Sequence, residues 1–273
     1  MEVNMGGRGS SSASAAGRGV GSNGAKRVDH STAAAIMADG SLSDAEKLRT
    51  IEQEILVNKV GFTNTKELDR LPLGQVASYA DALAELESQY GAVGEIKTVD
   101  WNDDIGTFQA VKTSGGTLAY VASAKSNAKM QYLAVNWNAG PALDKYNTVE
   151  KLISAQKKAE ESGWSMPTGG SDKQRLNYTI VHEYGHLLHN TIYENKVNSR
   201  ATTQTKAAWL ASQKRSIMSD AKKIAKQTGL SAEISQYGAK KASEFFAEAF
   251  ANAHLGKPTA VGHAMLNWLA KNK

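Results

Sequence analysis

The segment over residues 179–188 constrains this chain most, because it holds two histidines four residues apart. His182-Glu183-Tyr-Gly-His186 lies between the apolar pairs Ile180-Val181 and Leu187-Leu188, a pattern that predicts a buried helix. Positions i and i+4 of a helix share one face, so both imidazoles can bind the same ion. Glu183 lies beside them, where a carboxylate can take a proton from metal-bound water. The segment therefore predicts a zinc site on a helix.

The composition narrows the choice of ligands and partners. Of the 273 residues, 41% are hydrophobic and 22% are charged, as in an ordinary globular protein, and cysteine is absent. A metal must therefore be bound by histidine and carboxylate rather than by thiolate. The net charge of +5 is mild for this length. It favours lysines scattered over solvated helix faces, so we regard a nucleic-acid partner as unlikely.

The chain shows no membrane or secretion signal. No apolar run approaches the roughly 18 residues that a membrane-spanning helix needs. Residues 1–24 consist mostly of Gly, Ser and Ala and lack the apolar core of a signal peptide. We therefore expect no membrane span and a cytoplasmic or virion-associated protein, with non-classical secretion as the alternative.

Composition and periodicity predict three regions. Residues 1–40 are rich in Gly, Ser and Arg and predict a disordered leader, which serves either as a linker or as a tether to a larger assembly. Residues 41–92 predict helices, with capping-box spacing at Ser43-Asp-Ala-Glu46 and stops at Gly61 and Gly91. Residues 93–273 form the remaining domain.

This last region starts with strands and continues with helices. Short β-prone runs occupy residues 95–101, 107–112, 118–124 and 130–137, separated by turn-forming residues. They predict a four-stranded antiparallel or mixed sheet, with 130–137 as an edge along which an extended peptide can lie. Further helices are expected over about 149–163, 173–190, 204–227, 239–255 and 259–271. Helices, a small sheet and more helices make an α+β fold.

Two histidines do not complete a zinc site, which generally has three protein ligands. A metzincin would have glycine at 189 and histidine at 192, but this chain has His189 and Ile192. Glu244 and Glu248 lie four residues apart on a predicted helix otherwise built of Phe and Ala. Burying two carboxylates there is costly unless they meet a cation or hydrogen-bond donors. We assign Glu244 to the metal and Glu248 to a ligand histidine, although the spacing alone also permits the opposite assignment.

Two segments resemble a known family. Glu244-Phe-Phe-Ala-Glu-Ala-Phe, with Tyr237 seven residues earlier and the His182–His186 segment upstream, is similar to the catalytic domain of anthrax toxin lethal factor and to related domains from toxins, phages and mobile elements. The resemblance implies a Glu-ligated zincin-like domain over residues 93–273. It implies Glu244 as third ligand, Glu248 as support for a ligand histidine, and Tyr237 as stabiliser of the oxyanion or proton donor to the leaving amine. It covers under a sixth of the chain.

The implied chemistry is zinc-assisted hydrolysis of a polypeptide substrate in an extended conformation, with Glu183 as the general base. A second class stays open, namely a zincin-fold module that binds or supports a larger phage or toxin-like assembly. The intact Glu183 favours the enzyme, since a structural metal site has no use for a base.

The other histidines are not expected at the metal. His189 lies one turn beyond His186 but lacks ligand spacing, so we expect it at the surface or at the rim of the cleft. His254 and His263 fit packing on a helix face or exposure to solvent.

Overall fold

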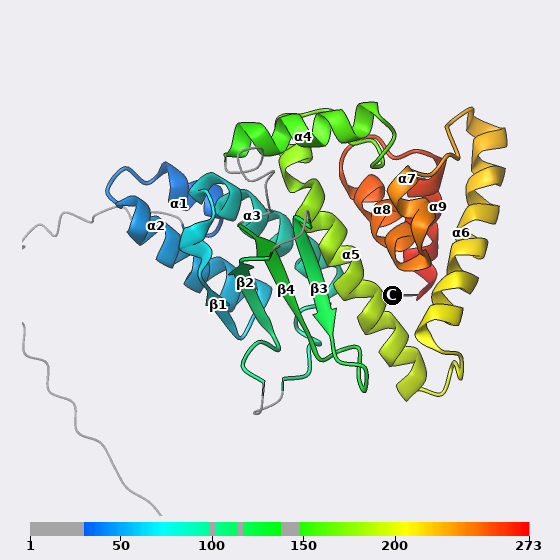
Figure 1. Cartoon of the computed structure of the whole chain (residues 1–273), viewed down its shortest axis with the longest axis horizontal. Helices are drawn as coiled ribbons and strands as arrows, with labels where there is room; N and C mark the ends of the chain where they lie inside the picture. Colours follow the sequence, from blue (N-terminus) through cyan, green and yellow to red (C-terminus); the bar gives the residue numbers. More distant parts are fainter. Residues whose placement is uncertain (1–29, 99–101, 114–116, 138–147, 273) are drawn as a thin grey trace, which may run out of the picture.

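The helix that carries the paired histidines, α5 (Asp172–Asn198), runs through the middle of the molecule (Figure 1). The computed structural model describes residues 30–98, 102–113, 117–137 and 148–272. Helix α5 begins at Ser171, whose side chain accepts a hydrogen bond from the backbone of Gln174, while the Gln174 side chain bonds back to the Ser171 backbone. This capping box starts the helix close to the expected position, and the helix continues about two turns beyond residue 190.

A mixed four-stranded sheet lies against one side of α5. The strands occur in the spatial order β1 (Asn64–Lys66), β2 (Thr107–Val111), β4 (Gln131–Asn136) and β3 (Ala119–Ser123). The β1–β2 and β2–β4 pairs are parallel, whereas β3 pairs with β4 in antiparallel fashion. Because β4 has neighbours on both sides, the expectation that residues 130–137 form a sheet edge is wrong. The edge next to α5 is β3.

One expected strand is also wrong. Residues 95–98 have no strand conformation, and 99–101 lie outside the described residues. Ile96 donates its N–H back to Val93, and Lys97 donates to the Lys129 carbonyl, so the segment turns instead of pairing along a neighbour. The fourth strand is β1, which is only three polar residues long and has no apolar alternation to reveal it.

The N-terminal helices pack beside the sheet and α5. They are α1 (Ala33–Ala38), α2 (Asp44–Thr50), the π-helix η1 (Ile51–Val60), the 3-10 turn η2 (Leu68–Arg70) and α3 (Leu73–Tyr90). Gly61 and Gly91 end two of them in left-handed backbone conformations, as expected. All of these helices except α2 contribute buried residues to the same hydrophobic core as α5.

Part of the segment expected to be a disordered leader is a helix. Residues 1–29 lie outside the described residues, but α1 occupies part of the segment assigned to the leader. Ala33 and Ile36 are fully buried. The Asp81 carboxylate on α3 accepts hydrogen bonds from the backbone N–H groups of Ala33 and Ala34. Asp81, almost fifty residues away in the sequence, thus accepts from the free N–H groups at the start of α1. Composition alone does not predict this short helix.

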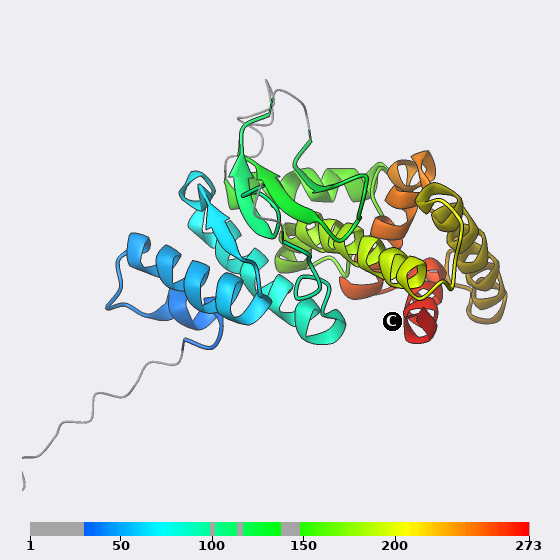
Figure 2. The same ribbon diagram turned by 90° about the horizontal axis from the view of Figure 1, so that it is seen from below.

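The remaining helices gather across α5 from the sheet (Figures 1 and 2). Helix α4 (Val149–Glu161) crosses one end of α5, and the others are α6 (Lys206–Thr228), α7 (Gln236–Lys240), α8 (Ala242–His254) and α9 (Ala260–Asn272). The helix expected over 239–255 is two helices, because Lys241 adopts an extended conformation (φ −143°, ψ 158°) between α7 and α8. The fold is α+β.

Within the described residues, no helix combines the length and apolar character that crossing a membrane requires.

Candidate metal centre

Three side chains from two helices converge at one point. His182 and His186 project from α5, and Glu244 projects from the first turn of α8. The Glu244 Oε2 atom lies 3.3 Å from His182 Nε2 and 3.4 Å from His186 Nε2. Tetrahedral ligands about 2.0–2.1 Å from a shared zinc ion lie about 3.3 Å from one another. The spacing therefore fits a single ion, and this group can hold a metal.

Gly185 allows the two helices to come this close. A Cβ atom at this position would lie 3.0 Å from the Ala247 Cα atom and 3.2 Å from the Phe250 Cβ atom, both on α8. Both distances are shorter than ordinary van der Waals contact. A glycine inside a helix usually costs stability, but here it brings the ligand faces of α5 and α8 together.

The electrostatics of the site favour a cation. Burial alone would lower the pKa of His182, but the nearby Glu244 and Glu248 carboxylates outweigh burial and raise the pKa to about 10. The Glu244 Oε2 atom is buried and accepts no hydrogen bond among the described residues. A buried carboxylate oxygen without a donor is costly, and a metal ion at the convergence point would satisfy it.

Glu248 holds His182 from behind. Its Oε1 atom lies 3.1 Å from His182 Nδ1, on the side of the ring opposite the convergence point. Its Oε2 atom accepts hydrogen bonds from the Ser235 hydroxyl at 2.5 Å and from the Met166 N–H at 2.8 Å. Burial raises the pKa of Glu248, yet bonds from His182 and other donors bring it below its usual range. The carboxylate is therefore ionised, and it favours the tautomer with a proton on Nδ1 and a free lone pair on Nε2.

Glu183 faces the cavity beside the ligands. Its side chain is buried, and its Oε2 atom has no hydrogen-bond partner among the described residues. Burial raises the pKa of Glu183, which the two ligand histidines partly oppose. A raised carboxylate pKa moves this group toward the range in which a general base works best at neutral pH.

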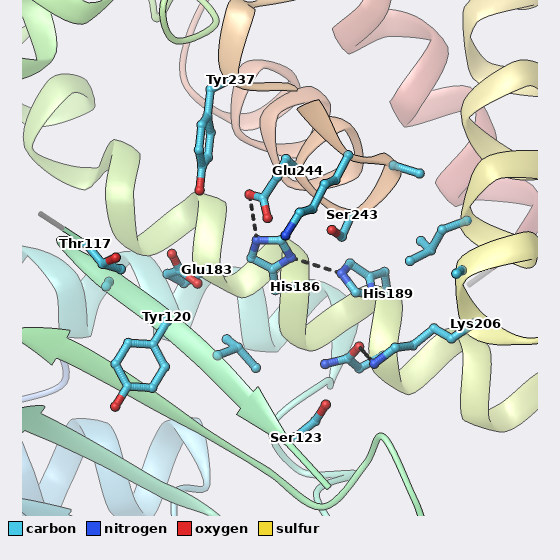
Figure 3. A pocket seen from close by; sticks show the side chains of 17 residues that line it. Thr117, Tyr120, Ser123, Glu183, His186, His189, Lys206, Tyr237, Ser243 and Glu244 are labelled. Carbon is cyan, nitrogen blue, oxygen red and sulfur yellow. Dashed lines mark hydrogen bonds and ion pairs between the residues drawn. The ribbon is translucent and has the colours of Figure 1, made fainter. Parts of the chain in front are cut away.

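Tyr237 reaches the same space from the short helix α7. Its ring centroid lies 5.7 Å from that of His182 and 5.7 Å from that of Trp164. In Figure 3 the hydroxyl group points between Glu183 and Glu244. Burial and the nearby Glu244 carboxylate hold the pKa of Tyr237 above its usual value, so the hydroxyl stays protonated and can donate a hydrogen bond.

His189 was expected at the surface or at the rim of the cleft; it is not at the surface, but it does line the larger of the two cavities beside the metal group. Its side chain is buried, and its Nε2 atom lies 3.0 Å from His186 Nδ1 (Figure 3). The ring also meets the Phe246 ring of α8 edge to face, with centroids 5.5 Å apart. Because α5 continues past residue 190 under α8, this face of the helix is covered. His189 thus holds the second ligand histidine, and its i+3 spacing from His186 was the available signal.

Sequence reasoning also missed the other groups around Glu248. Tyr178 is buried beside this carboxylate, and its hydroxyl lies 3.0 Å from the Met166 N–H. Ser235 caps α7 while it donates to Glu248. His254 is partly buried at 3.0 Å from the Tyr90 hydroxyl, and His263 is exposed, so both lie apart from the metal group as expected.

Two cavities open on either side of the centre. The larger, of about 600 Å³, is lined by β3, the start of α6 and the start of α8. The smaller, of about 380 Å³, lies between β3, α4 and α5. Glu183 and Tyr237 line both of them. An extended chain that passes from one cavity to the other along β3 would therefore cross the ligand site.

Comparisons of this chain with models of protein families, with curated proteins and with solved structures give no significant match. The motifs and the geometry of the site therefore carry the functional argument.

Proposed function

We propose that this chain is a zinc-dependent endopeptidase with a zincin-like domain similar to that of lethal factor. The observation that carries the proposal is the convergence of His182 Nε2, His186 Nε2 and Glu244 Oε2 beside an unpartnered Glu183 carboxylate oxygen. Three protein ligands leave one tetrahedral position open for water, as in catalytic rather than structural zinc sites. Two imidazoles and one carboxylate suit zinc among the common divalent ions.

The residues of the chain have distinct roles in this reaction. When bound, zinc would lower the pKa of a water molecule and polarise the scissile carbonyl. Glu183 accepts a proton from the attacking water and passes it to the departing amine. Tyr237 donates a hydrogen bond to the carbonyl oxygen on which charge develops. Glu248 and His189 hold the two ligand histidines in the tautomer and orientation that metal binding needs.

The proposed substrate is a polypeptide in an extended conformation. The outer strand β3 is half-buried and adjoins both cavities, so a peptide can add to the sheet there by backbone hydrogen bonds. This assigns peptide binding to β3, in place of the segment 130–137 that lies inside the sheet. The arrangement supports an endopeptidase, because the cavities extend on both sides of the ligand site.

The test compares the zinc-loaded full chain with its Glu183→Gln variant on a mixed peptide library. The parent should bind one equivalent of metal and cleave peptides, while the variant keeps metal and fold and loses roughly 10²–10⁴-fold in rate. Glu233→Gln, at an exposed position, is the matched control and should behave as the parent. A parent that binds metal and cleaves nothing would instead support a binding module. A parent without stoichiometric metal would overturn the metal centre.

A further inference from the structure

The larger cavity has an uneven distribution of charge. Its acidic lining residues are Glu183 and Glu244, both at the metal centre, and its basic lining residues are Lys206 and Lys241. Neither lysine forms an ion pair with an acidic side chain among the residues that the structure describes. Apart from the metal-centre residues, this cavity therefore presents two cationic groups that form no ion pair among the described residues.

Lys206 is built into the wall of this cavity. It is the first residue of α6, it is partly buried, and its Nζ donates a hydrogen bond to the Asn190 Oδ1 atom at 3.2 Å (Figure 3). Asn190 is itself buried and fixed, because its amide group donates to Gln131 Oε1 at 2.8 Å. The Asn190 bond uses one of the three ammonium N–H groups, so the others are available to a ligand.

Partial burial makes an anionic partner favourable for the Lys206 ammonium group. Desolvation lowers the pKa of Lys206, and the Glu194 carboxylate only partly opposes this effect. A cation that is partly removed from water gains more from a new anionic partner than a fully solvated lysine does. The site thus differs from the flexible lysines on the outer helix faces.

The smaller cavity lacks such a group. Its lining includes the apolar residues Leu152, Ala155, Ala159, Trp164 and Leu176. Its one lysine or arginine among the described residues is Arg175, which already lies 3.6 Å from the Glu160 carboxylate. The two sides of the ligand site therefore offer different chemistry to a chain that crosses it.

We propose that the substrate carries a carboxylate on the side of the scissile bond that occupies the larger cavity, where it pairs with Lys206. This inference rests on the proposed peptidase function and adds a substrate class to it. The carboxylate is either an Asp or Glu side chain within a few residues of the cleaved bond or the C-terminal carboxylate of a short peptide. Lys241, which is exposed at the start of α8 and also lines this cavity, strengthens the same preference.

The first experiment finds cleaved bonds in a peptide library with the zinc-loaded full chain, then compares matched Glu and Gln peptides. The Glu peptide should have a kcat/KM about ten-fold higher, the scale of a hydrogen bond to a charged group. Lys206→Gln keeps a donor for Asn190 and should remove this difference. Lys206→Glu should reverse it toward Lys over Gln; a carboxylate is favourable at a helix N-terminus, and urea unfolding checks that losing the bond to Asn190 leaves the variant folded. Lys222→Gln, exposed on the same helix, should leave the preference unchanged.

A second comparison separates the two sources of carboxylate. Library peptides with amidated C-termini should keep the preference when an Asp or Glu side chain is recognised, and they should lose it when the terminal carboxylate is recognised. The preference should weaken as salt increases, because screening acts on a partly exposed pair.

Binding measurements keep the inference testable without turnover. Zinc-loaded Glu183→Gln is titrated with the same Glu and Gln peptides, alone and combined with Lys206→Gln. Tighter binding of Glu peptides that disappears with Lys206→Gln supports the carboxylate site even where the parent cleaves nothing. Equal binding and cleavage of both peptides, or a Glu preference that survives Lys206→Glu, would overturn it while leaving the peptidase proposal intact.

Discussion

Replacing Glu248 by glutamine should weaken metal binding although Glu248 is not a proposed ligand. The carboxylate serves two sides at once: Oε1 meets His182 Nδ1, and Oε2 accepts from Ser235 and Met166. Glutamine has nearly the same shape but only one carbonyl oxygen, and its other side is an NH₂ donor. The variant can therefore accept either from His182 or from Ser235 and Met166, but not from both.

Either orientation of the new amide has a defined cost. If its oxygen faces Ser235 and Met166, its NH₂ group faces His182 Nδ1. His182 then keeps its proton on Nε2, which removes the lone pair that binds the metal. If its oxygen faces His182, its NH₂ group confronts the Met166 N–H, donor against donor, and Met166 keeps only the Tyr178 hydroxyl as acceptor, at a cost of about 1–3 kcal/mol. We expect metal affinity to fall roughly 10–100-fold, and the metal-free chain to lose about 1–3 kcal/mol of unfolding free energy.

Two measurements check this prediction. Competition with a chelator gives the metal affinity, and urea unfolding of the metal-free and zinc-saturated forms gives the stability. Glu233→Gln removes the same charge at an exposed position and should change neither quantity. A folded Glu248→Gln variant with the metal affinity of the parent would refute the reasoning, because His182 would then not depend on Glu248 for its tautomer.

Three further changes test other parts of the structure. Gly185→Ala should cost about 1–3 kcal/mol from overpacking against α8 and should weaken metal binding, whereas Gly74→Ala, with an ordinary 3.5 Å contact, should be nearly neutral in urea unfolding. His189→Leu should keep the fold but weaken metal binding about 10–100-fold in chelator competition, since His186 loses its partner. Burial lowers the pKa of His254 to about 4, so the unfolded chain gains a proton first as pH falls. Stability present above pH 6.5 should be lost toward pH 4 by roughly 2–3 kcal/mol. His254→Gln should flatten this pH dependence, and an unchanged slope would contradict the assignment.

Local patterns were sufficient to predict most of the longer helices. The capping boxes at Ser43 and Ser171 and the glycine stops at Gly61 and Gly91 involve residues within one or two turns of each other. These interactions form in the same way wherever the helix lies in the fold. The break at Lys241 was missed, because no residue near it in the sequence signals its extended conformation.

The sheet could not be predicted to the same extent. Strand β1 is too short and too polar to show an alternating apolar pattern. Residues 95–98 belong to a β-prone run, but they pair with no strand among the described residues. Strand order depends on contacts between residues far apart in the chain, and these leave no local signal. The wrong edge strand followed from reading the strands in chain order, whereas β3 lies outside β4.

The sequence by itself determined which residues make up the candidate metal group. The spacing of His182 and His186 on one helix face, with Glu183 beside them, and the pairing of Glu244 with Glu248 four residues later followed from helical periodicity. Only the tertiary structure decided how they meet: Gly185 brings α5 and α8 together, His189 turns inward to hold His186, and β3 borders both cavities. The physical reason is that periodicity places a side chain on a face of its own element, while packing between elements decides what that face contacts.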